Sequence, residues 1–262
     1  TFKEWDLVRI DKVNSDDKIY PLLLRSECKS KHVTDCVIVD LEGMNWDLYF
    51  QKLKRKIRYN VKKKMSNLKQ DADVGIFPIF TREDFEKEFV KMQQLYNTRW
   101  KNAKVKSFLA DSQYSQFFKE VVSEGFSKGW MLLFLIRANN KTIAYRLGFV
   151  HNKIFYDWNT SFDKNYFSYS PGKLSIAYLI QYLLENGYNK LHFMVGDYDY
   201  KRRWSLKDNR SSNYMFVLPS NSLFSKISVL YYCKWREYVK SAYLKIIKKK
   251  HLRRISRWIR KI

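Results

Sequence analysis

The stretch from residue 130 to residue 195 constrains the fold more than any other part of the chain. It contains three apolar runs that are separated by "ANNK" at 138–141 and "HNK" at 151–153. Because both separators are short and consist of turn-forming residues, they predict a meander of three antiparallel strands. The elements after this meander decide the fold class.

The segment "SPGKLSIAYLIQYLLENG" at 170–187 comes next and predicts a helix. Pro171 stands at its start and Gly187 at its end, which is the usual distribution of these residues at helix ends. A further strand, "LHFMV", comes after it at 191–195. A meander followed by a helix and another strand is typical of an α/β protein with a mixed sheet.

The first half of the chain adds elements of both kinds. Apolar residues at helical spacing predict a helix over 45–69, with Asn45 or Asp47 as its cap. Thr81 is expected to cap a second helix that runs over 81–100. The remaining predicted elements are strands at 5–10, 36–41 and 74–80, and a helix over 112–125 that Gly125 ends.

The charge of the chain points to polyanionic partners. Lys and Arg number 50 against 26 Asp and Glu, which gives a net charge of +24. Such an excess makes nucleic acid, anionic lipid and phosphate-bearing cofactors candidates. An AT-rich genome is the alternative explanation for part of the Lys count, but it does not explain why the charge is clustered. The clustered basic residues of the predicted helix are Lys52, Lys54, Arg55, Lys56, Arg58, Lys62, Lys63 and Lys64.

The cysteines argue against a disulfide scaffold and against a metal site. Cys28, Cys36 and Cys233 are odd in number, form no CxxC pair and have no His at ligand spacing. A reducing cytosol is therefore the simplest setting, and we predict no bound metal. No apolar run reaches the roughly 20 residues that a membrane-spanning helix needs.

The Pro-Gly pair before the helix at 170–187 is a candidate ligand site. A helix start leaves backbone N–H groups unpaired and carries the positive end of the helix dipole. A Gly at that point lets a ligand approach the backbone, which suits phosphate or pyrophosphate. Ser170, Gly172 and Lys173 are the expected cradle for such a group. An ordinary helix cap with no ligand is the alternative.

Five motifs in order carry a resemblance to a known family. The chain resembles the GNAT-type acyltransferase domain of the BioF2-like and cellulose-biosynthesis (CelD-like) group, which is related to the Fem peptidyltransferases. "NTRW" at 97–100 also looks like this group. The motifs are "IAYRLGF" at 143–149, "FYDWNTSFD" at 155–163, "YSPGKL" at 169–174, "NGYNKLHF" at 186–193 and "GDYDYKRRW" at 196–204.

The resemblance implies a fold, a donor and a division of the chain. The fold is a GNAT-like, mixed and mostly antiparallel sheet flanked by helices, and the donor is acetyl-CoA or another acyl-CoA. The chain lacks the Q/R-x-x-G-x-G/A loop of ordinary GNAT enzymes, and Fem relatives use aminoacyl-tRNA, so both donors stay open. Three parts are expected: residues 1–40 as the remnant of a preceding GNAT-like half, 41–219 as the acyltransferase domain, and 220–262 as a basic helical tail.

The family implies that an amine attacks the donor carbonyl directly, with no covalent enzyme intermediate. This reaction needs a base for the amine and an acid for the leaving group. Asp157 and Asp197, next to aromatic residues, are the candidate bases, with solvated surface acids as the alternative. Tyr198 and Tyr200 are the candidate acids, with core or rim tyrosines as the alternative.

Lys201 is the sharpest catalytic candidate. The element "YKRRW" resembles the aromatic-Lys-x-x-aromatic element of Fem-type transferases, in which the lysine meets acceptor phosphate or developing negative charge. An ammonium held between Tyr200 and Trp204 would be oriented and partly desolvated. An exposed lysine in a basic loop is the alternative.

The tail at 234–262 carries 12 basic residues and one acid, Glu237, with Trp and Ile at helical spacing. It is expected to lie on an anionic membrane surface, to bind an RNA backbone, or to pack its apolar stripe on the domain.

The leading hypothesis is an N-acyltransferase that moves an acyl group from acyl-CoA to an amine of a sugar or cell-surface precursor. It would be cytoplasmic or peripheral at the inner membrane face. The alternatives are a Fem-like aminoacyl-tRNA-dependent transferase and a non-catalytic basic module that binds membrane or nucleic acid.

Overall fold

The computed structural model describes residues 7–101, 107–219, 227 and 229 of the 262-residue chain. The contacts divide the chain into a smaller unit, Thr1–Asp35 with Ser211–Ile262, and a larger unit, Cys36–Arg210. The predicted tail, including 234–262, therefore lies outside the described residues apart from 227 and 229.

The smaller unit is a set of strands with one helix. Strand β1 (Leu7–Asn14) pairs antiparallel with β8 (Arg210–Pro219), and the first half of β2 (Lys29–Asp40) continues the strand order β1-β8-β2. Helix α1 (Ile19–Arg25) follows β1, and Tyr20 at its start packs its ring against Tyr214 of β8 at 5.1 Å.

The larger unit is built on the strand order β2-β7-β6-β5-β4-β3. Its neighbours are antiparallel except for β6 and β7, which run parallel. Its further strands are β3 (Val74–Ile79), β4 (Met131–Ala138), β5 (Lys141–His151), β6 (Ile154–Phe162) and β7 (Lys190–Val195). The meander predicted at 130–162 is β4, β5 and β6.

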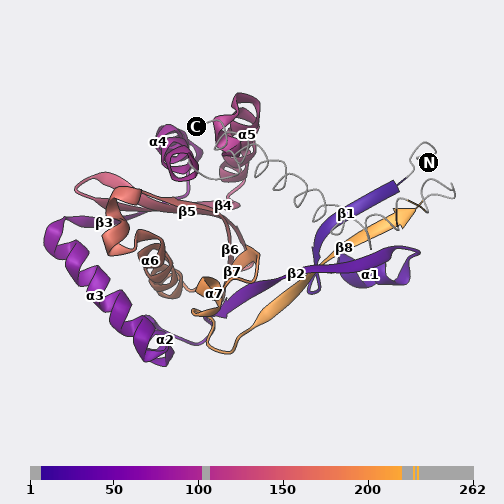
Figure 1. Cartoon of the computed structure of the whole chain (residues 1–262), viewed down its shortest axis with the longest axis horizontal. Helices are drawn as coiled ribbons and strands as arrows, with labels where there is room; N and C mark the ends of the chain where they lie inside the picture. The colour runs from indigo at the N-terminus through magenta and orange to yellow at the C-terminus, as the bar shows by residue number, and fades with distance from the viewer. Residues whose placement is uncertain (1–6, 102–106, 220–226, 228, 230–262) are drawn as a thin grey trace, which may run out of the picture. The chain divides into compact units, whose positions relative to one another are not determined.

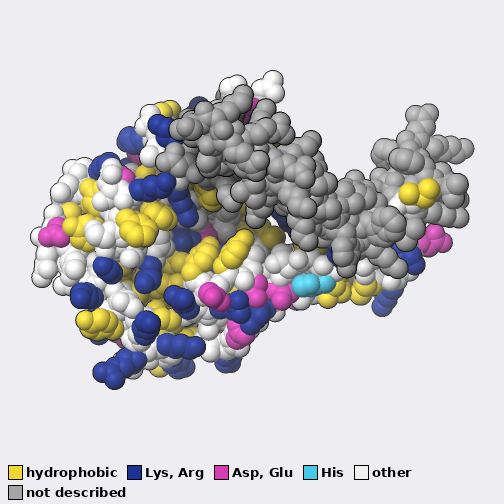
Figure 2. Space-filling model, in the orientation of Figure 1, with side chains coloured by type: hydrophobic (Ala, Val, Ile, Leu, Met, Phe, Trp, Pro, Cys, Tyr) yellow, Lys and Arg dark blue, Asp and Glu magenta, His cyan; other side chains and the backbone are white. Residues whose placement is uncertain are grey.

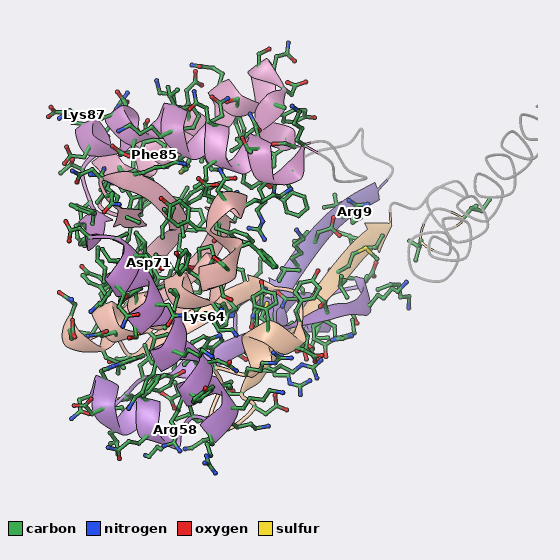
Figure 3. All side chains as sticks on the ribbon, turned by 60° about the vertical axis from the view of Figure 1, so that its left-hand side comes forward. Arg9, Arg58, Lys64, Asp71, Phe85 and Lys87 are labelled. Carbon is green, nitrogen blue, oxygen red and sulfur yellow. The ribbon has the colours of Figure 1, made fainter. Side chains whose placement is uncertain are left out.

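Helices cover both faces of this sheet (Figure 1). Helices α4 (Arg82–Trp100) and α5 (Ser112–Ser127) lie on one face, and α3 (Arg55–Asp71) and α6 (Pro171–Glu185) lie on the other. Each face has its own apolar core, and Phe85 of α4, labelled in Figure 3, is fully buried in the first. The shorter helices are α2 (Trp46–Lys52), α7 (Asp199–Arg202) and the 3₁₀ segments η1 (Phe108–Ala110) and η2 (Lys164–Tyr169).

This architecture confirms the expected α/β class, with a mixed and mostly antiparallel sheet flanked by helices. The caps also agree with the sequence: Asn45 accepts from the Leu48 N–H, and Thr81 accepts from the Asp84 N–H. The first meander turn has Asn139 and Asn140 in the left-handed region, which Asn tolerates better than most residues.

Two helix predictions were wrong in detail. The helix expected over 45–69 is two helices, because Leu53 takes an extended conformation (φ −65°, ψ 151°) and buries its side chain in the core. Gly125 does not end the third helix, which continues to Ser127. A Cβ at Gly125 would lie 2.6 Å from Met131, so close packing accounts for the glycine there.

A β-bulge in β6 sets up the functional site. Leu147 pairs with Asn159 and Gly148 pairs with Asp157, so Trp158 is the extra residue on β6. The bend brings the backbones so close that a Cβ at Gly148 would lie 2.2 Å from the Tyr156 carbonyl oxygen.

The bulge also reverses which side chains of β6 face α6. Before it, Asp157 lies on the α6 side, where it contacts Arg146. After it, Asn159 faces the α4 and α5 side, where its amide oxygen accepts from the Tyr145 hydroxyl at 2.7 Å. Thr160 therefore joins Asp157 on the α6 side, although the two are three residues apart.

Strands β6 and β7 separate beyond their first residues. Their parallel register runs from Ile154 and Lys190 to Tyr156 and His192. The later part of β6 is thus not paired with β7 near the start of α6, and the candidate site lies at this point.

Candidate active site

A cavity of about 540 Å³ lies in the larger unit where β6 leaves β7. It is bounded by the first turns of α3 and α6, the end of β6, and α7 with the residues after it. Its lining residues are Lys54, Lys56, Ile57, Asn60, Arg99, Arg146, Thr160, Phe162, Phe167, Ser170, Pro171, Gly172, Lys173, Ile176, Tyr200, Arg203 and Trp204.

The cavity lining is basic and apolar. It includes six basic side chains and no acidic one: Lys54, Lys56, Arg99, Arg146, Lys173 and Arg203. Figure 2 shows Lys and Arg gathered over this part of the larger unit, with hydrophobic side chains between them. A cavity of this kind attracts anions, because like charges held close together are relieved by a negatively charged ligand.

The start of α6 forms one wall of the cavity. Ser170 precedes the helix in the left-handed conformation (φ 55°, ψ 55°), and its side chain makes no capping hydrogen bond. The Lys173 and Leu174 N–H groups donate to the Ser170 carbonyl. Because Pro171 has no N–H, the Gly172 N–H is the donor that this first turn cannot satisfy itself.

Gly172 leaves little spare room. A Cβ at this position would lie 3.2 Å from two ring carbons of Phe162, which also lines the cavity. Larger side chains would therefore displace that ring.

Lys173 lies in a crowded positive field. Burial, followed by the charges of Arg203 and Lys64, lowers the pKa of its ammonium. Lys64, labelled on α3 in Figure 3, donates to the Ser168 carbonyl just before α6. An anion bound beside Lys173 would offset this repulsion.

Arg146 lines the cavity and has three polar partners. Its guanidinium pairs with Asp157 and donates from Nε to the Ser175 hydroxyl at 3.0 Å. A longer contact of 3.4 Å reaches the Gly172 carbonyl. Arg146 is 3% exposed, so this charge joins β5, β6 and the first turn of α6 in a nearly dry environment.

Asp157 is buried behind Arg146 and does not line the cavity. Its second carboxylate oxygen, Oδ1, is buried with no hydrogen-bond partner among the described residues. Burial raises the pKa of this carboxyl group, although the charges of Arg146 and Lys201 act against the rise.

Arg99 reaches the cavity from α4 at the end of β6. Its guanidinium donates to the Thr160 carbonyl at 3.2 Å and stacks over the Phe162 ring at 4.3 Å. Burial is the main cause that lowers its pKa.

Lys201 is buried at 6% exposure and lies outside the cavity lining. Its ammonium donates to the Phe193 carbonyl at 2.8 Å and to the Val195 carbonyl at 3.0 Å. These carbonyls belong to the part of β7 beyond its pairing with β6, so the lysine satisfies acceptors that the strand separation leaves open. It also anchors α7, which carries the cavity residue Tyr200 and is followed by Trp204.

The other predicted residues are divided between the cavity and the surface. Tyr200 lines the cavity, and burial raises the pKa of its phenol. Tyr198 is 59% exposed and stacks on Tyr200 at 6.0 Å. Asp197 lies outside the lining and pairs with Arg202 at 3.1 Å and Arg210 at 2.9 Å.

The structure thus brings together Ser170, Gly172, Lys173 and Tyr200, and it leaves Asp157, Asp197, Tyr198 and Lys201 outside the lining. Sequence reasoning missed Arg99 and Arg146 as site residues. The signal for Arg146 was present, because a charged residue inside the apolar strand "IAYRLGF" needs a partner.

The described residues hold no group of three or more His, Cys, Asp or Glu side chains that could bind a metal ion. Within the same residues, no helix is both long and apolar enough to cross a bilayer.

Solved structures with similar folds cover most of this chain. The C-terminal domain of a putative lysylphosphatidylglycerol synthetase from Agrobacterium fabrum has a TM-score of 0.58 and 11% identity, and the match covers 86% of this chain and 70% of that chain. FemX has a TM-score of 0.56 and 13% identity, with 87% and 74% covered. L-PGS from Bacillus licheniformis has a TM-score of 0.55 and 12% identity, with 87% and 72% covered. At these identities the likeness shows the fold alone.

A comparison with curated proteins found no match. The model of the family described as "Acetyltransferase (GNAT) domain" matches residues 55–202, which is more than half of the chain and contains every residue that lines the cavity except Lys54, Arg203 and Trp204. Enzymes with this fold generally use acyl-CoA donors. The chain belongs to this family and is an acyltransferase of the GNAT superfamily.

Proposed function

We propose that this protein transfers an acyl group, such as acetyl, from acyl-CoA to an amine, and that the acceptor is a sugar or a cell-surface precursor. The observation that carries the donor is the start of α6, whose first turn offers no acceptor for the Gly172 N–H and lines a cavity together with six basic side chains. A helix N-terminus and several cations together suit a pyrophosphate group. The acceptor class follows from the resemblance to the BioF2-like and CelD-like group.

In this proposal, the cradle is formed by Ser170, Gly172 and Lys173. The Gly172 N–H donates to a donor phosphate, and the Lys173 ammonium neutralises it. The amine then attacks the thioester carbonyl, the C–N bond forms, and the C–S bond breaks. The leaving thiolate takes a proton, and the amine nitrogen loses one.

Tyr200 is the proposed acid. It lines the cavity, and its raised pKa keeps the phenol protonated at neutral pH, so that it can donate to the thiolate. Tyr198, stacked on it, is the second candidate. Asp157 and Asp197 remain the proposed bases. Asp157 has more support because its Oδ1 is unpartnered and its pKa is raised, and a water would carry the amine proton to it.

A second donor, aminoacyl-tRNA, is supported by the extent of the basic surface. Helix α3 continues its positive charge beyond the cavity through Lys62, Lys63 and Lys69, which is more than a compact donor needs. An RNA backbone would meet such a row of cations. Contact of the tail 234–262 with an anionic membrane at the inner face stays a separate prediction.

Calorimetry with acetyl-CoA and with aminoacyl-tRNA, on the wild-type protein and on Gly172→Ala, tests the donor. The added methyl group would press on Phe162 and keep the phosphate from the backbone, so we expect acetyl-CoA to bind about tenfold more weakly. The melting temperature should change little, because Ala favours the helix. Unchanged acetyl-CoA binding in a folded variant would dismiss the cradle, and tight binding of aminoacyl-tRNA alone would favour the second donor.

Release of free thiol from acetyl-CoA on addition of amino sugars tests the reaction itself. A wild-type protein that binds acetyl-CoA but acylates no amine would contradict the proposed transfer.

A further inference from the structure

Arg99 is a cation without a counter-ion among the residues that the structure describes. Its guanidinium has five N–H donors, and in the described part of the chain it meets one acceptor, the neutral Thr160 carbonyl. It also lies over the faces of two rings, Phe162 at 4.3 Å and Trp100 at 5.5 Å. A half-buried guanidinium in this state is costly, because aromatic faces replace only part of its lost hydration.

Arg137 is a useful comparison, because it is a half-buried arginine over an aromatic ring that has a carboxylate partner within the protein. It is also half-buried on the larger unit, and it stacks over Phe77 at 4.4 Å. Unlike Arg99, it pairs with a carboxylate, Glu88, at 3.0 Å. The two arginines differ in that Arg99 lines the cavity, whereas Arg137 does not.

Arg99 is separate from the α6 cradle. Arg99 extends from α4 over the face of the Phe162 ring at 4.3 Å, whereas on α6 a Cβ at Gly172 would lie 3.2 Å from two carbons of the same ring. A phosphate held by Gly172 and Lys173 would therefore leave Arg99 unpaired, so the cavity offers a second place for negative charge.

We infer that Arg99 binds an oxyanion of the acceptor, so that the substrate class is an amine that carries a phosphate or a carboxylate. This inference rests on the proposed acyl-CoA donor, which occupies the α6 side. A planar guanidinium with several free N–H groups fits either oxyanion in a two-pronged geometry. The charge of the cavity supports the same class, because six cations repel a simple ammonium and attract an amine that carries an anion.

The test compares three amino sugars: glucosamine, glucosamine 6-phosphate and muramic acid, which carries a carboxylate. With acetyl-CoA as donor, the wild-type protein should prefer one or both anionic sugars over glucosamine. Arg99→Met should reduce kcat/KM for the preferred anionic sugar at least tenfold and change it for glucosamine less than threefold. Arg99→Lys keeps the charge but loses the two-pronged guanidinium geometry, so its kcat/KM for the anionic sugar should lie between those of the wild-type protein and Arg99→Met.

Arg58→Met is the matched control, because Arg58 is a surface arginine of α3 outside the cavity lining that donates to the Gln51 carbonyl. It should keep the wild-type ratio between the sugars. Folding is checked with Arg137→Met: losing the paired arginine should lower the melting temperature, whereas Arg99→Met should leave it equal or higher.

Calorimetry of each sugar alone separates this inference from the donor. Arg99-dependent binding of an anionic sugar by a protein that ignores acyl-CoA would contradict the proposed donor and support the acceptor site. Equal binding of all three sugars by the wild-type protein would overturn the inference. So would an Arg99→Met variant that binds CoA weakly but dephospho-CoA normally, because Arg99 would then hold the 3′-phosphate of the donor.

Discussion

Both faces of the larger unit carry basic residues, but the two faces differ in whether these residues have acidic partners. On α4 the described cations are mostly paired: Arg82 with Glu86 at 2.7 Å, Lys87 with Glu83 at 2.9 Å, and Lys91 with Glu88 at 2.9 Å; Lys128, just after α5, pairs with Glu124 at 3.3 Å. Helix α3, on the other face, has seven basic residues and one acid, Asp71 at its end, and no ion pair within the described residues includes those seven.

The start of α3 makes the contrast sharper. Its first turn contains basic residues and no acid, and its cap, Lys54, makes no side-chain capping bond. Positive charge at a helix N-terminus opposes the helix dipole. A high Lys content alone would spread over both faces, so the contrast supports the proposal that the cavity face binds an anion.

Among the basic residues that line the cavity, Arg146 has the one ion pair found in the described part of the chain, and its removal should have the largest effect. Arg146→Met leaves Asp157 as an unpaired buried carboxylate, which costs about 3–5 kcal/mol of unfolding free energy at neutral pH. Denaturant unfolding measured across pH would show it.

The pH dependence of this variant has a definite sign. The pKa of Asp157 is raised in the folded protein, so the folded state binds its proton more tightly than the unfolded state, and stability falls as pH rises above about 4. Without Arg146 the pKa rises further, and the loss extends to higher pH. The variant should therefore approach wild-type stability in acid. Arg146→Met combined with Asp157→Asn should lose this pH dependence, and a penalty that is the same at every pH would contradict the explanation.

Lys201 is a cation that carbonyls rather than carboxylates satisfy, and its removal should have the next largest effect. Lys201→Met leaves the Phe193 and Val195 carbonyls without their donor, and we expect a loss of about 2 kcal/mol. Because α7 then shifts with its cavity residue Tyr200, kcat should fall about 10²-fold.

Unfolding curves and steady-state kinetics with saturating acyl-CoA separate the two effects. A variant that is destabilised but keeps half its turnover would exclude Lys201 from the mechanism.

Much of the fold could be predicted from the sequence. The meander, the Asn-rich turns, the caps at Asn45 and Thr81, and the helix from Pro171 depend on neighbouring residues, which the sequence displays directly. The break at Leu53 and the bulge at Trp158 could not be predicted, because each results from packing between distant segments. Leu53 turns to bury its side chain in the core, and Trp158 stacks on Phe118 of α5 at 5.1 Å.

The site was predictable where it is local. Ser170, Gly172 and Lys173 are adjacent in sequence and line the cavity together. Arg99 joins them only through the tertiary fold, because α4 packs against the end of β6. The β6 bulge sets the side on which Thr160 and Phe162 lie, and that side is the one Arg99 reaches. Lys201 was expected to lie between Tyr200 and Trp204, but its ammonium is held by the Phe193 and Val195 carbonyls of β7, and no local pattern in the sequence revealed these partners.

The smallest expected effect tests the two faces directly. Lys54→Ala combined with Lys56→Ala removes two cations at the start of α3 that form no ion pair with the residues the structure describes. Lys87→Ala removes a cation of α4 that pairs with Glu83 at 2.9 Å and contacts Asp84 at 3.4 Å. The α3 variant should gain a few tenths of a kcal/mol, because repulsion from the helix dipole is relieved. The α4 variant should lose about 0.5 kcal/mol or less, as exposed pairs usually do.

Acyl-CoA binding should follow the opposite order. The α3 variant should bind the donor several-fold more weakly at low salt, with the difference shrinking at 1 M salt, where the screening length is about 3 Å. The α4 variant should bind it like the wild-type protein at every salt concentration. Calorimetry at two ionic strengths, with unfolding curves for both variants, measures each quantity. If the two variants lose stability equally and bind the donor equally well, the charge on α3 is a solvated surface, and the cavity face has no special affinity for anions.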